Sequence, residues 1–138
     1  MVMTVFTCYS VARRDGCASG LLARTLASSA SVDFPTVTDI CQLVHDDPKQ
    51  TVAVAEVLCS AMREGNDMTK QLKAATIAHE LLYDSCASRA MFETPGLLQA
   101  LGILQEVSGS RDDPVEGLLR LLTAEVMKHL LKEFCLEL

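Results

Sequence analysis

The sequence has no tryptophan, few other aromatic residues and no long apolar run. Four Phe and two Tyr are spread over 138 residues. No stretch of 18 apolar residues occurs, so the sequence predicts no transmembrane helix. No long segment alternates apolar and polar residues with period two, and residues 1–11 favour a strand only weakly. These absences leave a helical, non-membrane domain as the expectation.

The sequence also lacks the short motifs of common enzymes and metal sites. GxxxxGK[ST], GxGxxG, GxSxG and HExxH are absent, and so are CxxC and CxxH pairs. His79 is interpreted as a half-buried hydrogen-bonding residue rather than a base, and Asp46 and Asp47 as a helix stop and cap. We therefore expect a protein that is not an enzyme, with no cofactor and no metal.

Only four prolines occur, and they predict where helices begin. Proline suits the first helical position, and Asp47, Thr94 and Asp113 directly precede three of the four prolines, as helix caps do. Asn66 or Asp67 is expected to cap the helix that follows. The expected helices are 17–29, 35–45, 49–64, 67–86, 95–107 and 114–135, with a short helical turn at 88–93.

The helix at 67–86 is expected to lie at the centre, because it is apolar nearly all round: Leu72, Ala75, Ile77, Ala78, Leu81, Leu82 and Cys86. Connections of mostly two to eight residues predict sequential antiparallel packing. The last helix is expected to bury a stripe that includes Val115 and Leu118, with Glu116 outside. The predicted fold is an all-α, right-handed superhelical bundle of about six to eight helices, resembling an α-solenoid.

Cysteine usage and charge restrict the compartment and the partners. The six cysteines include Cys41, Cys59 and Cys86 on apolar helical faces, which predicts reduced, mostly buried thiols and a cytoplasmic protein. The net charge of −6 disfavours binding to nucleic acid. The domain is expected to span 17–138, including a polar, flexible loop at 108–113. Residues 1–16 form an extension, either disordered or a short amphipathic helix.

Several segments together resemble the ENTH/VHS/ANTH superfamily of trafficking domains. They are the helix with Arg24, the DFP link, TDICQLVHD, MREGND and KQLKAATIAHELLYDSCAS. The last segment is similar to a family pattern KAxTLxxxLL, and residues 24–28 are similar to the end of the first ENTH helix. The likeness covers residues 20–131 and is strongest over 36–88. The acidic balance and the HxxP link at residues 45–48 make the chain most similar to the tepsin type.

The resemblance implies two candidate sites. Phosphoinositide-binding ENTH domains hold the headgroup with basic residues, which match Arg24, Arg63, Lys70 and Lys73 here. VHS domains hold acidic sorting peptides between late helices, which match a groove near Lys128 and Lys132. In both cases solvated helix-end charges are the alternative interpretation. Glu64 and Asp67 would also lie beside the headgroup site and repel phosphate.

The resemblance also implies a function. We expect a non-enzymatic adaptor or scaffold module of vesicle trafficking, whose partners are adaptor or coat proteins or sorting peptides. Membrane association is expected to be peripheral and weak, at endosome, Golgi or vesicle membranes. The alternative is an armadillo- or HEAT-like helical interaction scaffold with no membrane role.

Overall fold

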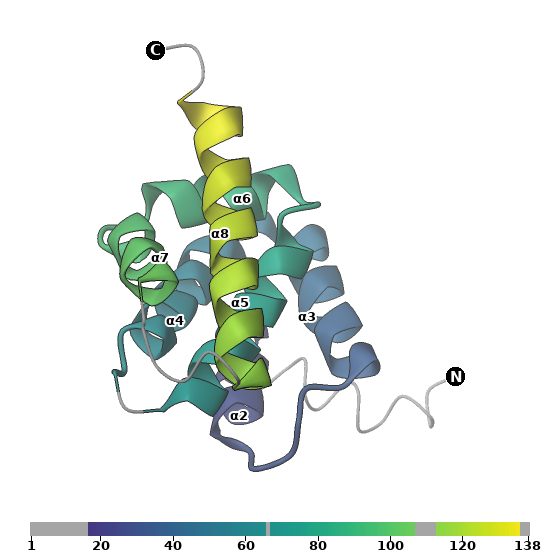
Figure 1. The fold of residues 1–138 in the computed structure, drawn as a ribbon. Coiled ribbons are helices and arrows are strands. Elements are labelled where there is room, and N and C mark those ends of the chain that lie inside the picture. Colours follow the sequence, from purple (N-terminus) through teal and green to yellow (C-terminus); the bar gives the residue numbers. More distant parts are fainter. Residues whose placement is uncertain (1–16, 66, 107–112, 136–138) are drawn as a thin grey trace.

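The computed structural model describes residues 17–65, 67–106 and 113–135. Within these ranges the chain forms seven α-helices, one 3-10 helix and no strand (Figure 1). The elements are α2 (Ala18–Ala27), α3 (Phe34–Asp46), η1 (Pro48–Gln50), α4 (Thr51–Met62), α5 (Met68–Leu81), α6 (Ser85–Glu93), α7 (Leu97–Gln105) and α8 (Pro114–Phe134). The predicted all-helical class is therefore confirmed. The expectations for residues 1–16 and for residues 108–112 of the polar loop lie outside the described residues.

Aspartate side chains cap most of these helices, because a carboxylate oxygen accepts one of the free backbone N–H groups at a helix start. The capping residues are Asp33 for α3, Asp47 for η1, Asp67 for α5, Asp84 for α6 and Asp113 for α8. The predicted caps at 47, 67 and 113 are confirmed. The prediction for Thr94 is wrong, since Thr94 ends α6 and α7 begins after Gly96.

The predicted central helix at 67–86 is two helices in the structure. Helix α5 ends at Leu81, and Asp84 starts α6 by accepting hydrogen bonds from the backbone N–H groups of Cys86 at 2.9 Å and Ala87 at 3.0 Å. Cys86 is consequently exposed on α6 instead of lying on the core face of α5. The capping signal outweighs the apolar pattern that runs through this boundary.

The core of the molecule is built around α4 and α5. Helix α5 packs against α2, α3, α4 and α8, while α4 packs against α2, α5, α6 and α7. Ala74, Ala75, Ile77, Ala78 and Leu81 are all buried, as a helix enclosed by neighbours requires. Figure 1 shows the long helix α8 lying along α5 beside α7. The prediction of a buried helix at the centre is confirmed.

The buried face of α8 differs from the predicted apolar stripe. Leu119, Val126 and Leu130 are buried as expected, but Val115 and Leu118 are exposed. Glu116 is only 3% exposed, and Arg120 donates to its carboxylate at 3.5 Å, so its predicted outer position is wrong. The face that packs follows the 3-4 spacing 116, 119, 123, 126, 130. This spacing identifies the buried face of α8 better than the most apolar positions do.

The cysteine side chains of the described residues differ in their exposure to solvent. The five described cysteines are unpaired, but Cys59 alone among them is buried and Cys86 is exposed. The thiols of the described residues are therefore less buried than predicted. None of the described helices combines the length and the apolar character needed to cross a membrane.

Candidate functional site

Lys73, a predicted headgroup ligand, lies at the junction of α5 and α2. Its residue is 5% exposed, and its ammonium group donates hydrogen bonds to the carbonyl oxygens of Thr25 at 3.3 Å and of Ser28. These carbonyl groups belong to the C-terminal end of α2, where helical partners run out and a cation complements the dipole. Lys73 thus completes α2 and fastens it to α5.

Lys70, one turn earlier, lies at the same end of α5. Its ammonium group contacts both carboxylate oxygens of Glu64, at 3.0 and 3.2 Å. Lys70 and Lys73 both line a polar hollow of about 470 Å³, together with Ser28, Ser29 and Asp67. The structure therefore brings these two lysines together, with acidic residues beside them, as the sequence predicted.

The two arginines of the predicted headgroup site line other hollows. Arg24 is exposed on α2 beside Thr25, Ser28 and Asp33 in a hollow of about 250 Å³. Arg63 is exposed at the end of α4 and lines two further hollows. No described hollow holds all four cations, so the four-residue headgroup site stays a prediction.

The predicted cargo groove concerns α5 and α8. The two helices pack directly against each other, and Lys128 and Lys132 are exposed on α8. Neither lysine lines the apolar hollow between α4, α5 and α7. Their proposed role in binding a sorting peptide stays a prediction.

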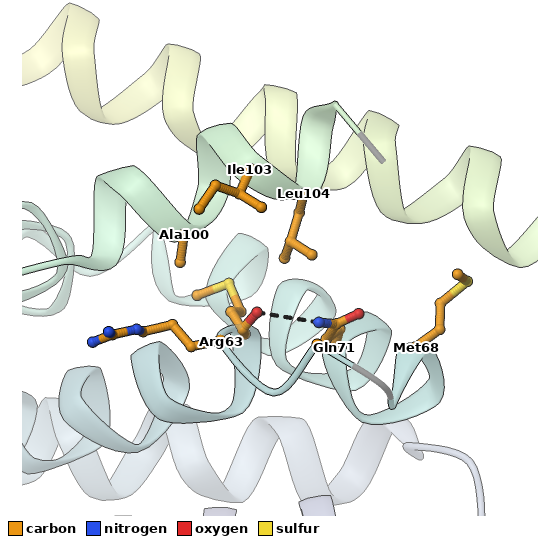
Figure 2. A pocket seen from close by; sticks show the side chains of 8 residues that line it. Arg63, Met68, Gln71, Ala100, Ile103 and Leu104 are labelled. Atoms are coloured by element: carbon orange, nitrogen blue, oxygen red, sulfur yellow. Dashed lines mark hydrogen bonds between the residues drawn. The ribbon is translucent and has the colours of Figure 1, made fainter. Parts of the chain in front are cut away.

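An apolar hollow lies between the end of α4, the start of α5 and α7 (Figure 2). It has a volume of about 390 Å³, within the range of small ligand pockets. Figure 2 shows Ala100, Ile103 and Leu104 on one side, with Arg63, Gln71 and Met68 opposite. The lining residues are Met62, Arg63, Gly65, Met68, Gln71, Ala100, Ile103 and Leu104. We call this hollow the α4–α7 groove.

Gln71 is the buried polar residue of the groove. It is 5% exposed, and its side-chain nitrogen donates to the carbonyl oxygens of Met62 at 3.2 Å and Glu64 at 2.8 Å. These two acceptors fix the orientation of the amide, because only its nitrogen can donate. They also hold the link between α4 and α5 in place. The amide oxygen accepts no hydrogen bond from any described residue.

Arg63 is the charged residue of the groove. No ion pair joins it to a described acid. One guanidinium nitrogen lies 3.4 Å from the position that a Cβ atom on residue 96 would occupy, so a larger residue there would crowd Arg63. Gly96 also has φ +87°, a backbone conformation that favours glycine. On its other side Arg63 lines a hollow of about 360 Å³ whose lining includes Glu56, Ser60 and Glu64.

Away from the groove, two thiols have shifted acidities. Burial raises the pKa of Cys41 to about 11, and the nearby carboxylates of Glu80 and Asp84 act in the same direction. At the start of α2, a hydrogen bond with Ser19 and the backbone N–H of Gly20 lower the pKa of the Cys17 thiol. Among the described residues, no cluster of three or more His, Cys, Asp or Glu side chains is placed to hold a metal ion.

The sequence interpretation missed most of the groove. Arg63 was singled out for a different role, but Gln71, Met68 and Ile103 received no role. One signal was present: Gln71 is a polar residue between Lys70 and Leu72 at the start of an otherwise apolar helix. The approach of α7 to this end of α5 depends on tertiary packing, which periodicity does not encode.

The chain was compared with protein-family models, with curated proteins and with solved structures, and none of the three comparisons found a match.

Proposed function

We propose that the chain is a non-enzymatic adaptor or scaffold module of vesicle trafficking, of ENTH/VHS type, that works through protein partners. The residue pattern that resembles the superfamily supports this proposal, and so does the confirmed all-helical class. Within it, the helices are proposed to follow the right-handed superhelical path of that superfamily. The proposed location is the cytoplasm, at endosome, Golgi or vesicle membranes.

The observation that carries the proposal is the contrast between the two kinds of hollow. Two of the four predicted headgroup residues have partners within the protein, since Lys73 holds α2 and Lys70 pairs with Glu64. The α4–α7 groove, by contrast, is apolar and carries an arginine and an amide oxygen without described partners. Such a combination of apolar lining and a few oriented polar groups suits a protein ligand better than a polyphosphate headgroup.

Binding of phosphoinositides is the first test. The protein is incubated with liposomes that each carry one phosphoinositide, at physiological ionic strength, and sedimented. We expect it to stay in the supernatant across the panel. Glu64→Gln, which frees Lys70 of its partner, serves as a control for a latent site. Saturable binding of the unmodified chain to one phosphoinositide, abolished by Lys70→Glu, would move the protein to the lipid-binding branch.

Binding of peptides is the second test. A phage-displayed library of linear peptides is selected on the folded chain, with an unrelated helical protein as the control bait. We expect a set of related sequences to be enriched on this chain alone. An absence of enrichment, combined with lipid binding, would contradict a function through protein partners.

A further inference from the structure

We infer that the α4–α7 groove binds a short extended peptide in which an aliphatic side chain lies beside a single carboxylate residue. This inference rests on the proposed function through protein partners and specifies the surface and the ligand chemistry. The aliphatic side chain fills the hollow, the carboxylate pairs with Arg63, and a backbone N–H donates to Gln71. Each contact follows from a separate observation.

The apolar contact follows from the lining of the groove. Met62, Ala100 and Leu104 are buried and form its walls, whereas Ile103 is 59% exposed at its edge. Figure 2 shows Met68 and Ile103 at opposite sides of the opening. An aliphatic side chain that enters here removes its own apolar surface and that of Ile103 from water. The unbranched side chains of Met62 and Met68 can adjust to its shape.

The backbone contact follows from Gln71. Its amide nitrogen is held by two backbone carbonyl groups, so its oxygen is presented in a fixed direction at the groove. The residue is almost entirely buried and the oxygen accepts no hydrogen bond from the described residues. Since the described residues contain no buried side-chain oxygen or nitrogen without a hydrogen-bond partner, this oxygen is accessible from the groove. The N–H of an extended peptide supplies a donor while the neighbouring side chain enters the hollow.

The carboxylate follows from Arg63, which is the one charged residue among the described residues that line the groove. Its planar guanidinium group is suited to a two-point contact with a carboxylate, and no described acid occupies it. The charge of the whole chain, −6, repels a strongly acidic partner at long range. Glu56 and Glu64 act likewise from the adjacent hollow. These charges favour a single carboxylate over an acidic cluster.

The experiment uses the phage library described above, selected in parallel on the unmodified chain and on matched variants. Ile103→Ser changes the edge of the groove, and Leu121→Ser is its control, since Leu121 is 57% exposed on α8. Arg63→Gln removes the groove cation, and Arg24→Gln removes an exposed arginine elsewhere. All four positions are exposed, so each variant is expected to fold, which circular dichroism verifies.

We expect enriched sequences with an aliphatic residue next to, or one residue away from, a single Asp or Glu. Ile103→Ser should abolish the enrichment, and Leu121→Ser should leave it unchanged. On Arg63→Gln the aliphatic preference should persist while the acidic preference disappears, and Arg24→Gln should preserve both preferences.

The most enriched peptide is then synthesised with an acetylated N-terminus and an amidated C-terminus, so that the terminal groups contribute no charge. Replacing its acidic residue by the corresponding amide should weaken binding about tenfold on the unmodified chain and much less on Arg63→Gln. In NMR titrations the side-chain NH2 signals of Gln71 and the methyl signals of Ile103 and Met68 should shift with the same saturation curve. The methyl signals of Leu121 should not shift.

Three results would overturn the inference, and they differ in meaning. If enrichment survives Ile103→Ser, or if the preference for an acidic residue persists on Arg63→Gln, the peptide binds elsewhere and the proposed function stays intact. Concentration-dependent self-association that shifts the same signals without peptide makes the groove an interface between two copies of the chain. The absence of any enriched peptide contradicts the groove ligand, and only together with lipid binding does it also contradict the proposed function.

Discussion

At the scale of single residues, the same side chain type has opposite roles within one turn of α5. Lys73 is buried and donates to carbonyl groups at the end of α2, whereas Lys70 forms a partly exposed pair with Glu64. The first contact supplies a donor to carbonyl groups at the end of α2, of which that of Thr25 also accepts from the backbone N–H of Ser28. The second replaces contacts that both charges also make with water. Their contributions to stability should therefore differ.

Lys73→Met tests this difference. Methionine keeps the apolar stem but removes the donor, so we expect the free energy of unfolding to fall by about 1–3 kcal/mol as the carbonyl groups of Thr25 and Ser28 lose the ammonium group. Lys70→Met, the matched control, should cost less than about 1 kcal/mol. Urea denaturation followed by circular dichroism measures both. Equal losses would show that Lys73 does not hold α2.

Cys41 gives a prediction for the pH dependence of stability. Its pKa is raised from the ordinary value of 9.0 to about 11 in the folded protein, first by burial and then by Glu80 and Asp84. The unfolded chain therefore loses this proton at lower pH than the folded chain. The contribution of Cys41 to stability is fully present below pH about 9 and is lost as pH rises toward about 11.

Urea denaturation of the unmodified chain and of Cys41→Ala, repeated between neutral pH and this window, isolates the contribution of the thiol. We expect the unmodified chain to lose stability more steeply with rising pH than the variant. Parallel pH profiles for the two proteins would mean that the thiol titrates alike in the folded and unfolded states.

The predicted role of a residue was correct where the residue contacts its own helix, and wrong where its environment depends on a segment distant in sequence. Asp67 was expected to cap the next helix, and it does so through bonds within four residues. Lys73 could not be recognised as a link to Ser28, because that contact joins residues 45 positions apart. Glu116 was likewise predicted to face solvent because it is charged, but the packing of α8 buries it.

At the scale of elements, the boundary between α5 and α6 decides how the second half of the chain is arranged. The aspartate at position 84 begins α6, and its other carboxylate oxygen lies 3.5 Å from a nitrogen of His45 at the end of α3. The break allows α6 to turn away and pack against α4 and α8. Continuation of α5 through this point would remove these contacts.

Asp84→Ala should lower the free energy of unfolding by about 0.5–2 kcal/mol, because it removes the cap of α6. Asp84→Asn keeps an oxygen that can accept the same backbone N–H groups and should cost much less. Both variants remove the negative charge beside His45, so the difference between them reports the cap alone. Thermal or urea denaturation provides the measurement. If asparagine were as costly as alanine, the charge rather than the cap would be responsible.

The elements were largely predictable, because caps and apolar spacing are local signals. Helices α3 and α8 begin within one residue of the predicted starts, each preceded by an aspartate. The merger of α5 with α6 was the main error. Leu81 and Leu82 continue the apolar pattern toward Cys86, and the prediction followed this pattern across the polar residues 84–85, which include the cap of α6.

At the scale of the whole molecule, contacts join helices that are distant in sequence. Helix α8 packs against α5, and α4 packs against both α2 and α7. In a repeat array each unit touches only its neighbours, and its stability spreads along the chain in near-independent steps. The contacts observed here instead connect the first described helix to the last through α4 and α5.

These connections predict that the chain unfolds as one cooperative unit. Hydrogen exchange measured by mass spectrometry at increasing urea should give the same unfolding midpoint for peptides from α2 and from α8. Leu22→Ala, which deletes a fully buried side chain in α2, should cost about 2–5 kcal/mol and lower both midpoints together. The signal from α8 is decisive, because α2 packs against α5, and α5 in turn packs against α8. A midpoint that falls in α2 while α8 keeps its original value would show that the two ends of the bundle unfold independently, as the repeats of a solenoid do.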